Sequence, residues 1–322
     1  MKVAMLGHKR VPSREGGVEV VVENLAVRMV KAGWQVTCYN RRGEHVSGNE
    51  YSEMELDEYK GVRLKRVFTY NQKGLAAVTS SMAAALRSTF GGYDIVHFHA
   101  EGPSAMLWLP KLFGKRCIAT IHGLDWQRAK WGGFATRYLK FGEWVAARFS
   151  DELIVLTEGA KQYFLDTYGR ESTIIPNGVE RPELAEPTMI RNKYGLEKDS
   201  YILFLGRIVP EKGIQYLIEA YSRLKTDKKL VIAGGSSDTS AFMADLKRRT
   251  ASNPNIIFTG FVKGRLLTEL YSNAYIYALP SDLEGMPLSL LEAMSHGTCS
   301  LISDIEACTS VVEDPATGKR WA

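Results

Sequence analysis

Residues 274–296 read AYIYALPSDLEGMPLSLLEAMSH, and this stretch decides the fold class because it passes from a strand through a tight turn into a helix. The apolar run at 274–279 predicts a buried strand. Gly285 permits a sharp bend, and Pro287 suits the first position of a helix expected over 287–296. Free N–H groups at such a helix start, with the positive end of the helix dipole, favour a phosphate.

Two glutamates flank this turn and helix. Glu284 lies in the turn, and Glu292 lies about two helical turns into the helix, among apolar neighbours. A carboxylate in such surroundings needs hydrogen-bond donors, and the hydroxyls of a ribose would supply them. Taken alone, the pair is also explained by a surface loop, a buried helix and a satisfied glutamate, and that alternative stays open here.

Short apolar runs alternate with helical patterns along the rest of the chain. In the first helical pattern, Val18, Val22, Leu25 and Met29 fall on one face. The expected strands are 2–6, 34–39, 61–67, 94–98, 116–121, 152–156, 200–206, 229–233, 255–259, 274–279 and 298–302. The expected helices are 18–32, 75–89, 134–149, 158–168, 213–225, 239–250 and 287–296.

This alternation runs twice, with a seam rich in turn-forming residues at 175–182 (IPNGVERP). It predicts an α/β fold with two Rossmann-like domains, 1–175 and 176–322, each a parallel sheet with helices on both faces. Ligands of such folds bind at the carboxyl ends of the strands, so we expect the site in a cleft between the two domains.

The composition is that of a soluble globular protein, with 322 residues, 45% hydrophobic and 24% charged. The net charge of +5 is uneven, because residues 1–170 carry +7 and residues 171–322 carry −2. The first half should therefore meet something anionic, either a phosphate-bearing substrate or an anionic membrane surface. No basic stripe or helix-turn-helix pattern supports a nucleic-acid partner. A merely solvated basic surface is the remaining alternative.

Several motifs are missing, and their absence excludes function classes. The chain holds no G-x-G-x-x-G and no G-x-x-x-x-G-K-[ST], which argues against a nicotinamide dehydrogenase and a P-loop ATPase. No run of about 18 apolar residues predicts a membrane span. No Asp-x-Asp and no His/Cys cluster at zinc spacing occurs, so we expect no metal site. Four scattered cysteines are expected to be reduced core residues of a cytosolic protein, namely Cys38, Cys117, Cys299 and Cys308.

Two glycine-containing loops are candidates for contacting phosphate. Gly16-Gly17 follows the first expected strand and precedes the first helix, a geometry that can cradle an anion. Arg207 and Lys212 lie in the segment 206–213 (GRIVPEKG), at the carboxyl end of the strand 200–206. Two fixed cations at that place could neutralise a diphosphate, although solvated loop charges are the alternative.

A histidine at a strand end is a third candidate. His122 closes the strand 116–121 and precedes a glycine, so it should point toward the site. The alternative is a structural histidine bonded to the backbone. His97 and His99 close the strand 94–98, and we interpret them as structural.

Together these residues resemble a known family, the family-four group of retaining glycosyltransferases with the GT-B fold. The resemblance is carried by Glu284-x₇-Glu292, by Arg207 with Lys212, and by Gly16-Gly17. Further matches follow in the same order along the chain, at 175–179 (IPNGV), 232–235 (IAGG), 257–261 (IFTGF) and 298–304 (TCSLISD).

The resemblance implies a role for each matched residue. Arg207 and Lys212 would bind the diphosphate of a nucleotide-sugar, and Glu292 would bind its ribose. Glu284 and His122 would contact the transferred sugar. The other implied contacts are Gly285, Met286 and Leu288 beside Glu284 through their backbone N–H groups, Gly235, Phe261 and Val262 at the base, and Gly16 and Gly17 at the phosphate.

The resemblance also implies a mechanism. The departing nucleoside diphosphate develops negative charge, which fixed cations and amide dipoles would stabilise without a metal ion or other cofactor. We therefore expect a retaining transferase that moves a sugar to a glycan or lipid-linked acceptor by a same-face displacement. Two alternatives stay open, a non-catalytic nucleotide-sugar binding protein and a sugar-nucleotide epimerase.

The end of the chain departs from the family pattern. Family members usually continue for several tens of residues past the segment that matches 311–314 (VVED), whereas this sequence ends at Ala322. We therefore expect a truncated second domain, which would leave the activity of the chain as given in question.

The segment 126–149 is aromatic and basic, which raises the question of a membrane surface. Its helix would place Tyr138, Phe141 and Val145 on one face, with basic residues beside them. The hypothesis is peripheral contact of a cytoplasmic protein with anionic headgroups, and the alternative is an ordinary amphipathic core helix. The aromatic residues are Trp126, Trp131, Phe134, Tyr138, Phe141, Trp144 and Phe149, and the basic ones are Arg128, Lys130, Arg137, Lys140 and Arg148.

Overall fold

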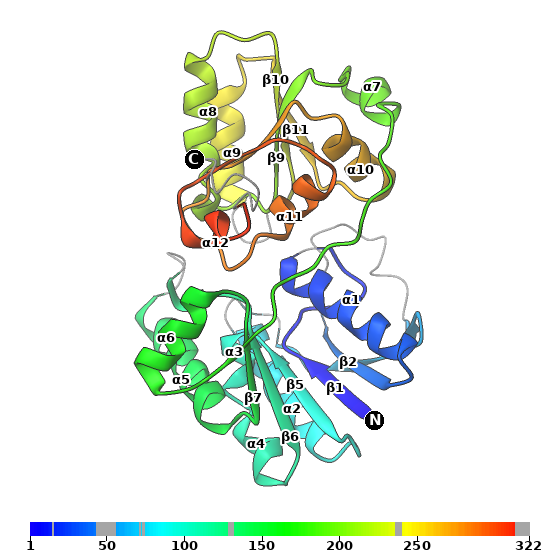
Figure 1. Cartoon of the computed structure of the whole chain (residues 1–322), viewed down its shortest axis with the longest axis vertical. Coiled ribbons are helices and arrows are strands. Elements are labelled where there is room, and N and C mark those ends of the chain that lie inside the picture. Colours follow the sequence, from blue (N-terminus) through cyan, green and yellow to red (C-terminus); the bar gives the residue numbers. More distant parts are fainter. Residues whose placement is uncertain are drawn as a thin grey trace. The chain divides into compact units, whose positions relative to one another are not determined.

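The structure is a computed structural model that describes residues 1–14, 16–42, 56–70, 72, 75–127, 132–235 and 240–312. The chain divides into two compact units, which we call unit 1 (Met1–Asn177) and unit 2 (Gly178–Ala322) (Figure 1). The sequence placed the boundary after residue 175. Each unit is an α/β layer structure with a parallel sheet, so the predicted fold class is confirmed.

Among the described residues, unit 1 forms an eight-stranded sheet in the order β3-β4-β2-β1-β5-β6-β7-β8. All neighbouring strands are parallel except the short β3, which pairs antiparallel with β4. The strands are β1 Lys2–Leu6, β2 Gln35–Arg41, β3 Glu58–Tyr59, β4 Val62–Val67, β5 Ile95–His99, β6 Arg116–Ile121, β7 Glu152–Val155 and β8 Thr173–Ile174.

Both faces of this sheet are buried. Alternate residues of a strand point to opposite faces, so neighbouring residues belong to different hydrophobic clusters. In β1, Val3 and Met5 belong to one hydrophobic cluster, while Ala4 and Leu6 belong to another. The first cluster is completed by α1 and the second by α2, α5 and α6. The helices of unit 1 are α1 Gly17–Lys31, α2 Leu75–Thr89, α3 Glu101–Ser104, α4 Trp108–Leu112, the 3₁₀ helix η2 Asp125–Gln127, α5 Gly133–Phe149 and α6 Glu158–Tyr168.

The described part of unit 2 has a five-stranded, wholly parallel sheet in the order β11-β10-β9-β12-β13. The connections between these parallel strands place α8 and α9 on one face of the sheet and α10 and α11 on the other, as Figure 1 shows. The strands are β9 Tyr201–Leu205, β10 Lys229–Ala233, β11 Ile256–Gly260, β12 Ile276–Leu279 and β13 Ser300–Ile302. The helices are α7 Met189–Tyr194, the 3₁₀ helix η3 Pro210–Lys212, α8 Ile214–Arg223, α9 Ser240–Thr250, α10 Gly264–Ser272, α11 Leu288–Ser295 and α12 Glu306–Thr309.

The strand orders locate the ligand edge of each unit. The chain reverses its direction of travel across the sheet between β1 and β5 in unit 1, and between β9 and β12 in unit 2. Such a switch point leaves a crevice outside the carboxyl ends of the two strands. The loops that follow these four strands are therefore where each unit's candidate residues should be sought.

Short elements were missed by the sequence analysis. The strands β3 and β8 have only two residues each, which is too few for a period to be read. The helix α10 was missed although Leu266, Leu267, Leu270 and Tyr271 recur at helical spacing, a signal that could have found it. The strands and helices that the sequence did predict lie within about two residues of the observed bounds.

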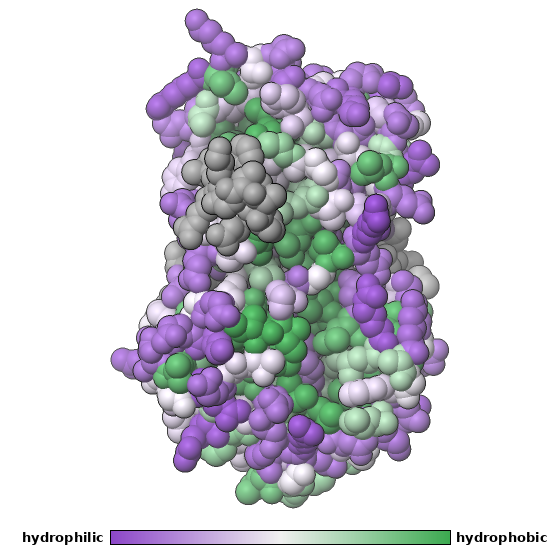
Figure 2. Space-filling model, in the orientation of Figure 1, coloured by the Kyte–Doolittle hydropathy of each residue, from purple (hydrophilic) through white to green (hydrophobic). Residues whose placement is uncertain are grey.

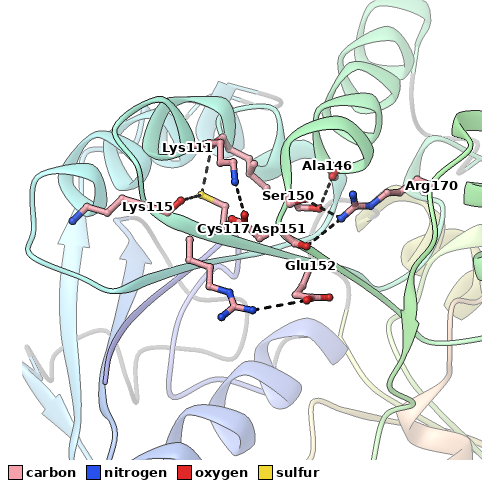
Figure 3. A network of polar contacts seen from close by, with 10 residues as sticks. Lys111, Lys115, Cys117, Ala146, Ser150, Asp151, Glu152 and Arg170 are labelled. Atoms are coloured by element: carbon pink, nitrogen blue, oxygen red, sulfur yellow. Dashed lines mark hydrogen bonds and ion pairs between the residues drawn. The ribbon is translucent and has the colours of Figure 1, made fainter.

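A polar network holds the amino-terminal edge of β6 and β7, at the far end from the ligand edge (Figure 3). The Asp151 carboxylate accepts a hydrogen bond from the backbone N–H of Cys117 at 2.7 Å and pairs with Lys111. Arg170 donates to the carbonyl oxygens of Ser150 and Asp151 at 2.9 and 3.3 Å. These contacts fix the relative position of β6 and β7, so the network is structural.

The predicted burial of the cysteines is confirmed for three residues and is wrong for the fourth. Cys38, Cys117 and Cys308 are buried free thiols, whereas Cys299 is exposed because it precedes the short edge strand β13. Burial raises the pKa of Cys308 to about 12, with Glu284 adding to the effect. None of the helices in the described ranges is long and apolar enough to cross a bilayer.

Candidate functional site

In unit 2, the loops after β9 and β10 are tied together by backbone hydrogen bonds. The N–H of Ile208 donates to the carbonyl of Gly235 at 3.0 Å, and that of Gly206 donates to Ala233 at 3.0 Å. A Cβ on Gly234 would lie 1.8 Å from the carbonyl oxygen of Gly206, so only glycine permits this approach. The half-buried Arg207 and the half-buried Gly235 are thereby held at neighbouring strand ends.

Lys212 and Glu284 form an ion pair across the switch point of unit 2. Their side chains are only 12% and 9% exposed, and Ser281 Oγ also donates to the Glu284 carboxylate at 2.7 Å. A Cβ on Gly213 would lie 1.8 Å from the carbonyl oxygen of Pro280, so glycine lets η3 approach the end of β12. The predicted phosphate-binding cation and the predicted sugar-binding carboxylate therefore contact each other directly.

The helix after this turn begins one residue later than predicted. Pro287 is the N-cap rather than the first helical residue, and its carbonyl accepts the N–H of Leu290 at 3.1 Å and of Leu291 at 3.2 Å. The first N–H groups of α11, beginning with Leu288, therefore have no acceptor inside the helix. Gly285 and Met286 lie in the half-buried turn that leads to it.

Glu292 is held from the side by an aromatic residue of α10. The hydroxyl of the buried Tyr271 donates to Glu292 Oε2 at 3.0 Å, which fixes how the carboxylate is turned. A second buried tyrosine, Tyr277, bonds to Ser289 Oγ at 2.8 Å and to the Leu205 carbonyl at 3.2 Å. Burial raises the pKa of Tyr277 well above its usual range, so its hydroxyl remains protonated.

Two of the three residues assigned to the base pocket, Phe261 and Val262, differ in how deeply they are buried. Phe261 is half-buried directly after β11, whereas Val262 is 8% exposed and belongs to the hydrophobic core of unit 2. Packing therefore accounts for the side chain of Val262.

In unit 1, the Gly16-Gly17 turn faces a carboxylate that sequence reasoning missed. Gly16 has extended backbone and caps α1, which begins at Gly17. The buried Glu19 accepts the backbone N–H of Lys9 at 2.9 Å, and a Cβ on Gly16 would lie 2.5 Å from Glu19 Oε2. The signal available was an acidic residue in the first turn of a helix, where it interacts favourably with the dipole. A phosphate at this helix start would meet the negative charge of Glu19.

The histidines of unit 1 gather at the ends of β1, β5 and β6. His99 Nδ1 lies 3.1 Å from His122 Nε2, and His97 Nε2 lies 2.8 Å from Thr120 Oγ1. Burial lowers the pKa of His97 to about 3 and that of His122 to about 4, while the pKa of His99 falls well below its ordinary 6.5. These imidazoles are therefore neutral at pH 7. The sequence predicted a structural His99 but not its bond to His122.

A pair of buried glutamates beneath the His122 loop was not predicted. Glu101 follows β5, and Glu143 lies on α5, where it accepts hydrogen bonds from Trp126 Nε1 at 3.0 Å and from Tyr163 at 2.8 Å. Burial, with Asp125 and Glu143 nearby, raises the pKa of Glu101 to about 10, so Glu101 is protonated at pH 7. Through Trp126, this cluster holds the loop that carries His122. No group of three potential metal ligands was found in the described segments.

Two protein families match the chain. The family described as Glycosyltransferase Family 4 matches residues 15–181, and Glycosyl transferases group 1 matches residues 188–319. An uncharacterized glycosyltransferase of Methanocaldococcus jannaschii is 25% identical over 99% of this chain and 84% of the relative. The UDP-Gal:alpha-D-GlcNAc-diphosphoundecaprenol alpha-1,3-galactosyltransferase of Escherichia coli is 28% identical over 70% of this chain and 62% of the relative.

Solved structures share the fold. The sucrose-phosphate synthase of Thermosynechococcus elongatus superposes with a TM-score of 0.74 at 20% identity, covering 97% of this chain and 83% of that one. The Anabaena protein HepE in complex with UDP-glucose superposes with a TM-score of 0.76 at 15% identity, covering 98% and 83%. At these identities the likeness establishes the fold alone, which is the predicted GT-B fold.

Proposed function

Because this chain belongs to glycosyltransferase family 4 and is a transferase enzyme, we propose that it moves a sugar from a nucleotide-diphospho-sugar to a glycan or lipid-linked acceptor, with retention of configuration and without a metal ion. One observation carries the proposal. The mostly buried pair of Lys212 and Glu284 lies at the ligand edge of unit 2, where it joins the segment 206–213 to the turn before α11.

This pair suits a site in which Lys212 and Glu284 separate when a nucleotide-sugar binds and each then contacts the ligand. A diphosphate would attract Lys212 and Arg207, and the N–H groups at the start of α11 would add positive dipole. Lys212 would then turn from Glu284 to the phosphate, which leaves the carboxylate free to accept hydroxyls of the transferred sugar. Glu292, oriented by Tyr271, would accept the ribose hydroxyls.

The proposed reaction balances without an added reagent. The bond between the anomeric carbon and the β-phosphate oxygen breaks, and the bond from that carbon to the acceptor oxygen forms on the same face. The acceptor's hydroxyl proton passes to the leaving diphosphate. Arg207 and Lys212 stabilise the charge that develops on this leaving group, which is the role a metal ion would otherwise take.

A donor screen tests the proposal. UDP-, GDP-, ADP- and dTDP-sugars are incubated with glycan and lipid-linked acceptors, and the anomeric configuration of the product is read by NMR. We expect transfer with retention that persists in EDTA. Loss of transfer in EDTA, restored by Mg²⁺ or Mn²⁺, contradicts metal independence. Interconversion of the donor sugar without an acceptor favours the epimerase, and binding without turnover favours the binding protein.

We also propose that unit 1 contacts an anionic membrane surface, on the cytoplasmic side, through α5. Phe134, Phe141 and Trp144 are 87%, 46% and 45% exposed, and Arg137 and Arg148 are exposed on the same stripe of the helix. Hydrophobic residues also reach the surface of unit 1 on the face drawn in Figure 2. An exposed stripe that alternates aromatic and cationic side chains suits the headgroup region.

The observed face of α5 differs from the prediction. Val145 is buried and Tyr138 is half-buried, with its hydroxyl bonded to the Gly102 carbonyl at 3.0 Å, so only Phe141 of the three predicted residues is exposed. Lys140 lies over the Trp126 ring at 4.1 Å and is therefore engaged within the unit. Arg128, Lys130 and Trp131 lie outside the described residues.

Flotation with liposomes containing phosphatidylserine tests the membrane proposal. We expect the wild-type chain to float and a variant with Phe134→Ser, Arg137→Ala and Arg148→Ala to stay in the soluble fraction. Arg223→Ala with Lys225→Ala, two exposed cations in unit 2, is the matched control. Equal flotation of all three proteins would rule the surface out.

A further inference from the structure

The bond between His99 and His122 links a fully buried imidazole to the one that the proposed function places against the sugar. His99 ends β5 with no exposed surface, and its ring meets that of His122 edge to edge, with centroids 5.4 Å apart and the ring planes 28° from each other. A Cβ on Gly7 would lie 2.1 Å from the His99 carbonyl oxygen, so β1 packs tightly against this residue. His99 is therefore held in place independently of any ligand.

The direction of this bond follows from the other nitrogen of His99. A neutral imidazole carries one N–H and one lone pair, so one ring donates and the other accepts. If His122 Nε2–H donated, the proton of His99 would remain on its Nε2, which is buried and has no partner among the described residues. A buried N–H without an acceptor is rare and costly. If His99 Nδ1–H donates instead, only a ring lone pair is left unpaired.

In His8, another buried histidine of unit 1, the ring nitrogen without a partner is likewise a lone pair and not an N–H. Asn40 donates through Nδ2 to the Val11 carbonyl at 2.8 Å and accepts the Val11 N–H through Oδ1 at 3.1 Å, so the orientation of its amide is determined. His8 Nε2 lies 3.1 Å from that same Oδ1 and must donate to it. The unpartnered Nδ1 of His8 is therefore a lone pair, and not an N–H.

We propose that His99 is a positioning residue that holds His122 as the tautomer protonated on Nδ1, so that His122 presents an N–H donor, and not a base, to an oxygen of the transferred sugar. The inference rests on the proposed function only for the identity of that oxygen. A donor hydrogen bond would orient a sugar hydroxyl without taking its proton. This agrees with a reaction in which the leaving diphosphate accepts the only proton that moves.

The tautomer can be read directly, without substrate. In protein labelled with ¹⁵N at histidine, a long-range ¹H–¹⁵N correlation spectrum distinguishes protonated from unprotonated ring nitrogens, and the His122 signals are identified by their loss in His122→Asn. We expect Nδ1 of His122 to be protonated and Nε2 to be unprotonated at pH 7. The reverse assignment in the wild-type chain overturns the proposal, whatever the enzyme's activity.

Variants of His99 test the positioning role. His99→Phe keeps an aromatic ring at this position but removes the N–H donor, so part of His122 should convert to the Nε2–H tautomer and kcat should fall about tenfold. His99→Asn, whose side-chain amide can donate in the place of Nδ1, should restore both the Nδ1–H tautomer of His122 and kcat. His97→Phe is the matched control on the same strand, because His97 bonds to Thr120 rather than His122. An unchanged His122 tautomer in His99→Phe contradicts the proposal.

The two proposals fail in distinguishable ways. If no donor supports transfer, the proposed function fails while the spectrum still decides the tautomer. If His99→Phe is poorly folded, as judged by circular dichroism, the wild-type spectrum and His99→Asn remain decisive.

Discussion

At the scale of single residues, the ligand edge of unit 2 depends on a charge pair that is mostly buried. Lys212 and Glu284 compensate each other where water is largely excluded, and Ser281 supplies an additional donor. By contrast, Arg223 and Glu219 form a pair with side chains 77% and 63% exposed, whose worth is close to zero. The two pairs allow buried and exposed charges to be compared within one unit.

Replacing Lys212 by Ala should damage both stability and activity. Glu284 would remain buried without its counter-charge, which costs about 3 kcal/mol of unfolding free energy. The leaving diphosphate would also lose a cation, so kcat should fall about a hundredfold. Urea denaturation and initial rates measure the two effects.

Two further variants separate these effects. Lys212→Met combined with Glu284→Gln removes both charges, so it should recover most of the stability and none of the activity. Arg223→Ala should change neither quantity. Full activity in the double variant would show that neither charge takes part in the reaction.

The raised pKa of Glu101 predicts how the stability of the protein depends on pH. Its pKa is raised to about 10 by burial and by Asp125 and Glu143, whereas the unfolded chain ionises it near 4.5. Between these values the folded state holds a proton that the unfolded state releases, so this residue's contribution to stability falls as pH rises. The loss is at most about 1.4 kcal/mol per pH unit.

Glu101→Gln removes this dependence. Its unfolding free energy relative to wild type should increase from pH 5 to pH 9, as measured by denaturant titration at each pH. Glu158→Gln, at an exposed position at the start of α6, is the control and should follow the wild-type curve. Parallel curves for Glu101→Gln and wild type would contradict a protonated Glu101.

At the scale of elements, close helix packing sets the position of α3 beneath the ligand edge of unit 1. Gly142 lies inside α5, where a Cβ would be 2.0 Å from the carbonyl oxygen of Glu101. Helix propensity alone would favour alanine over glycine by about 1 kcal/mol. The contact with α3 reverses that preference, because the obstacle is backbone and cannot move aside.

Gly142→Ala should therefore destabilise the protein, by about 2 kcal/mol, through overpacking. The matched control is Gly133→Ala in the same helix, where an added Cβ meets nothing within 4 Å. That control should be neutral or slightly stabilising. Thermal unfolding of the two variants compares them, and equal melting temperatures would argue against the tight α3–α5 contact.

At the scale of the whole molecule, each unit has its own hydrophobic core, so the two can respond differently to acid. The described part of unit 1 holds four neutral histidines, of which His8, His97 and His99 are buried and His122 is half-buried. Burial lowers the pKa of His8 to about 4, that of His97 to about 3 and that of His122 to about 4, and it lowers that of His99 well below 6.5. The unfolded chain binds protons at these sites below pH 6.5 while the folded chain does not, so their contribution to stability is lost as pH falls.

Unit 1 should therefore lose amide protection before unit 2 on acidification from pH 6.5 to 4. Glu101 has the opposite effect, because its contribution to the unfolding free energy grows as pH falls, but four histidines act against this one residue. In unit 2, burial of Glu269 is outweighed by donors that include the Ile190 N–H, so its pKa is lowered and its stabilisation is lost only below about pH 4.5. Hydrogen exchange with mass spectrometry, corrected for intrinsic rates, resolves the two units, and simultaneous loss of protection would contradict the prediction.

The sequence alone determined the class of fold, most element positions and the family. This information is local, because a buried strand or an amphipathic helix reveals its period within a few residues. Gly285 with Pro287, and Gly16 with Gly17, likewise identified where helices begin. The loops that carry His122, Arg207 and Glu284 were found for the same reason, since each directly follows an apolar strand.

Only the tertiary structure decided which of these side chains meet. Lys212 and Glu284 are 72 positions apart, His99 and His122 are 23 apart, and each pair is joined because strand order places two loops at one edge of a sheet. Glu19 and Glu143 were missed because a buried carboxylate is recognised by its donors, which come from other elements. Periodicity records which face of an element is buried, but the partner on that face depends on how the sheet is assembled.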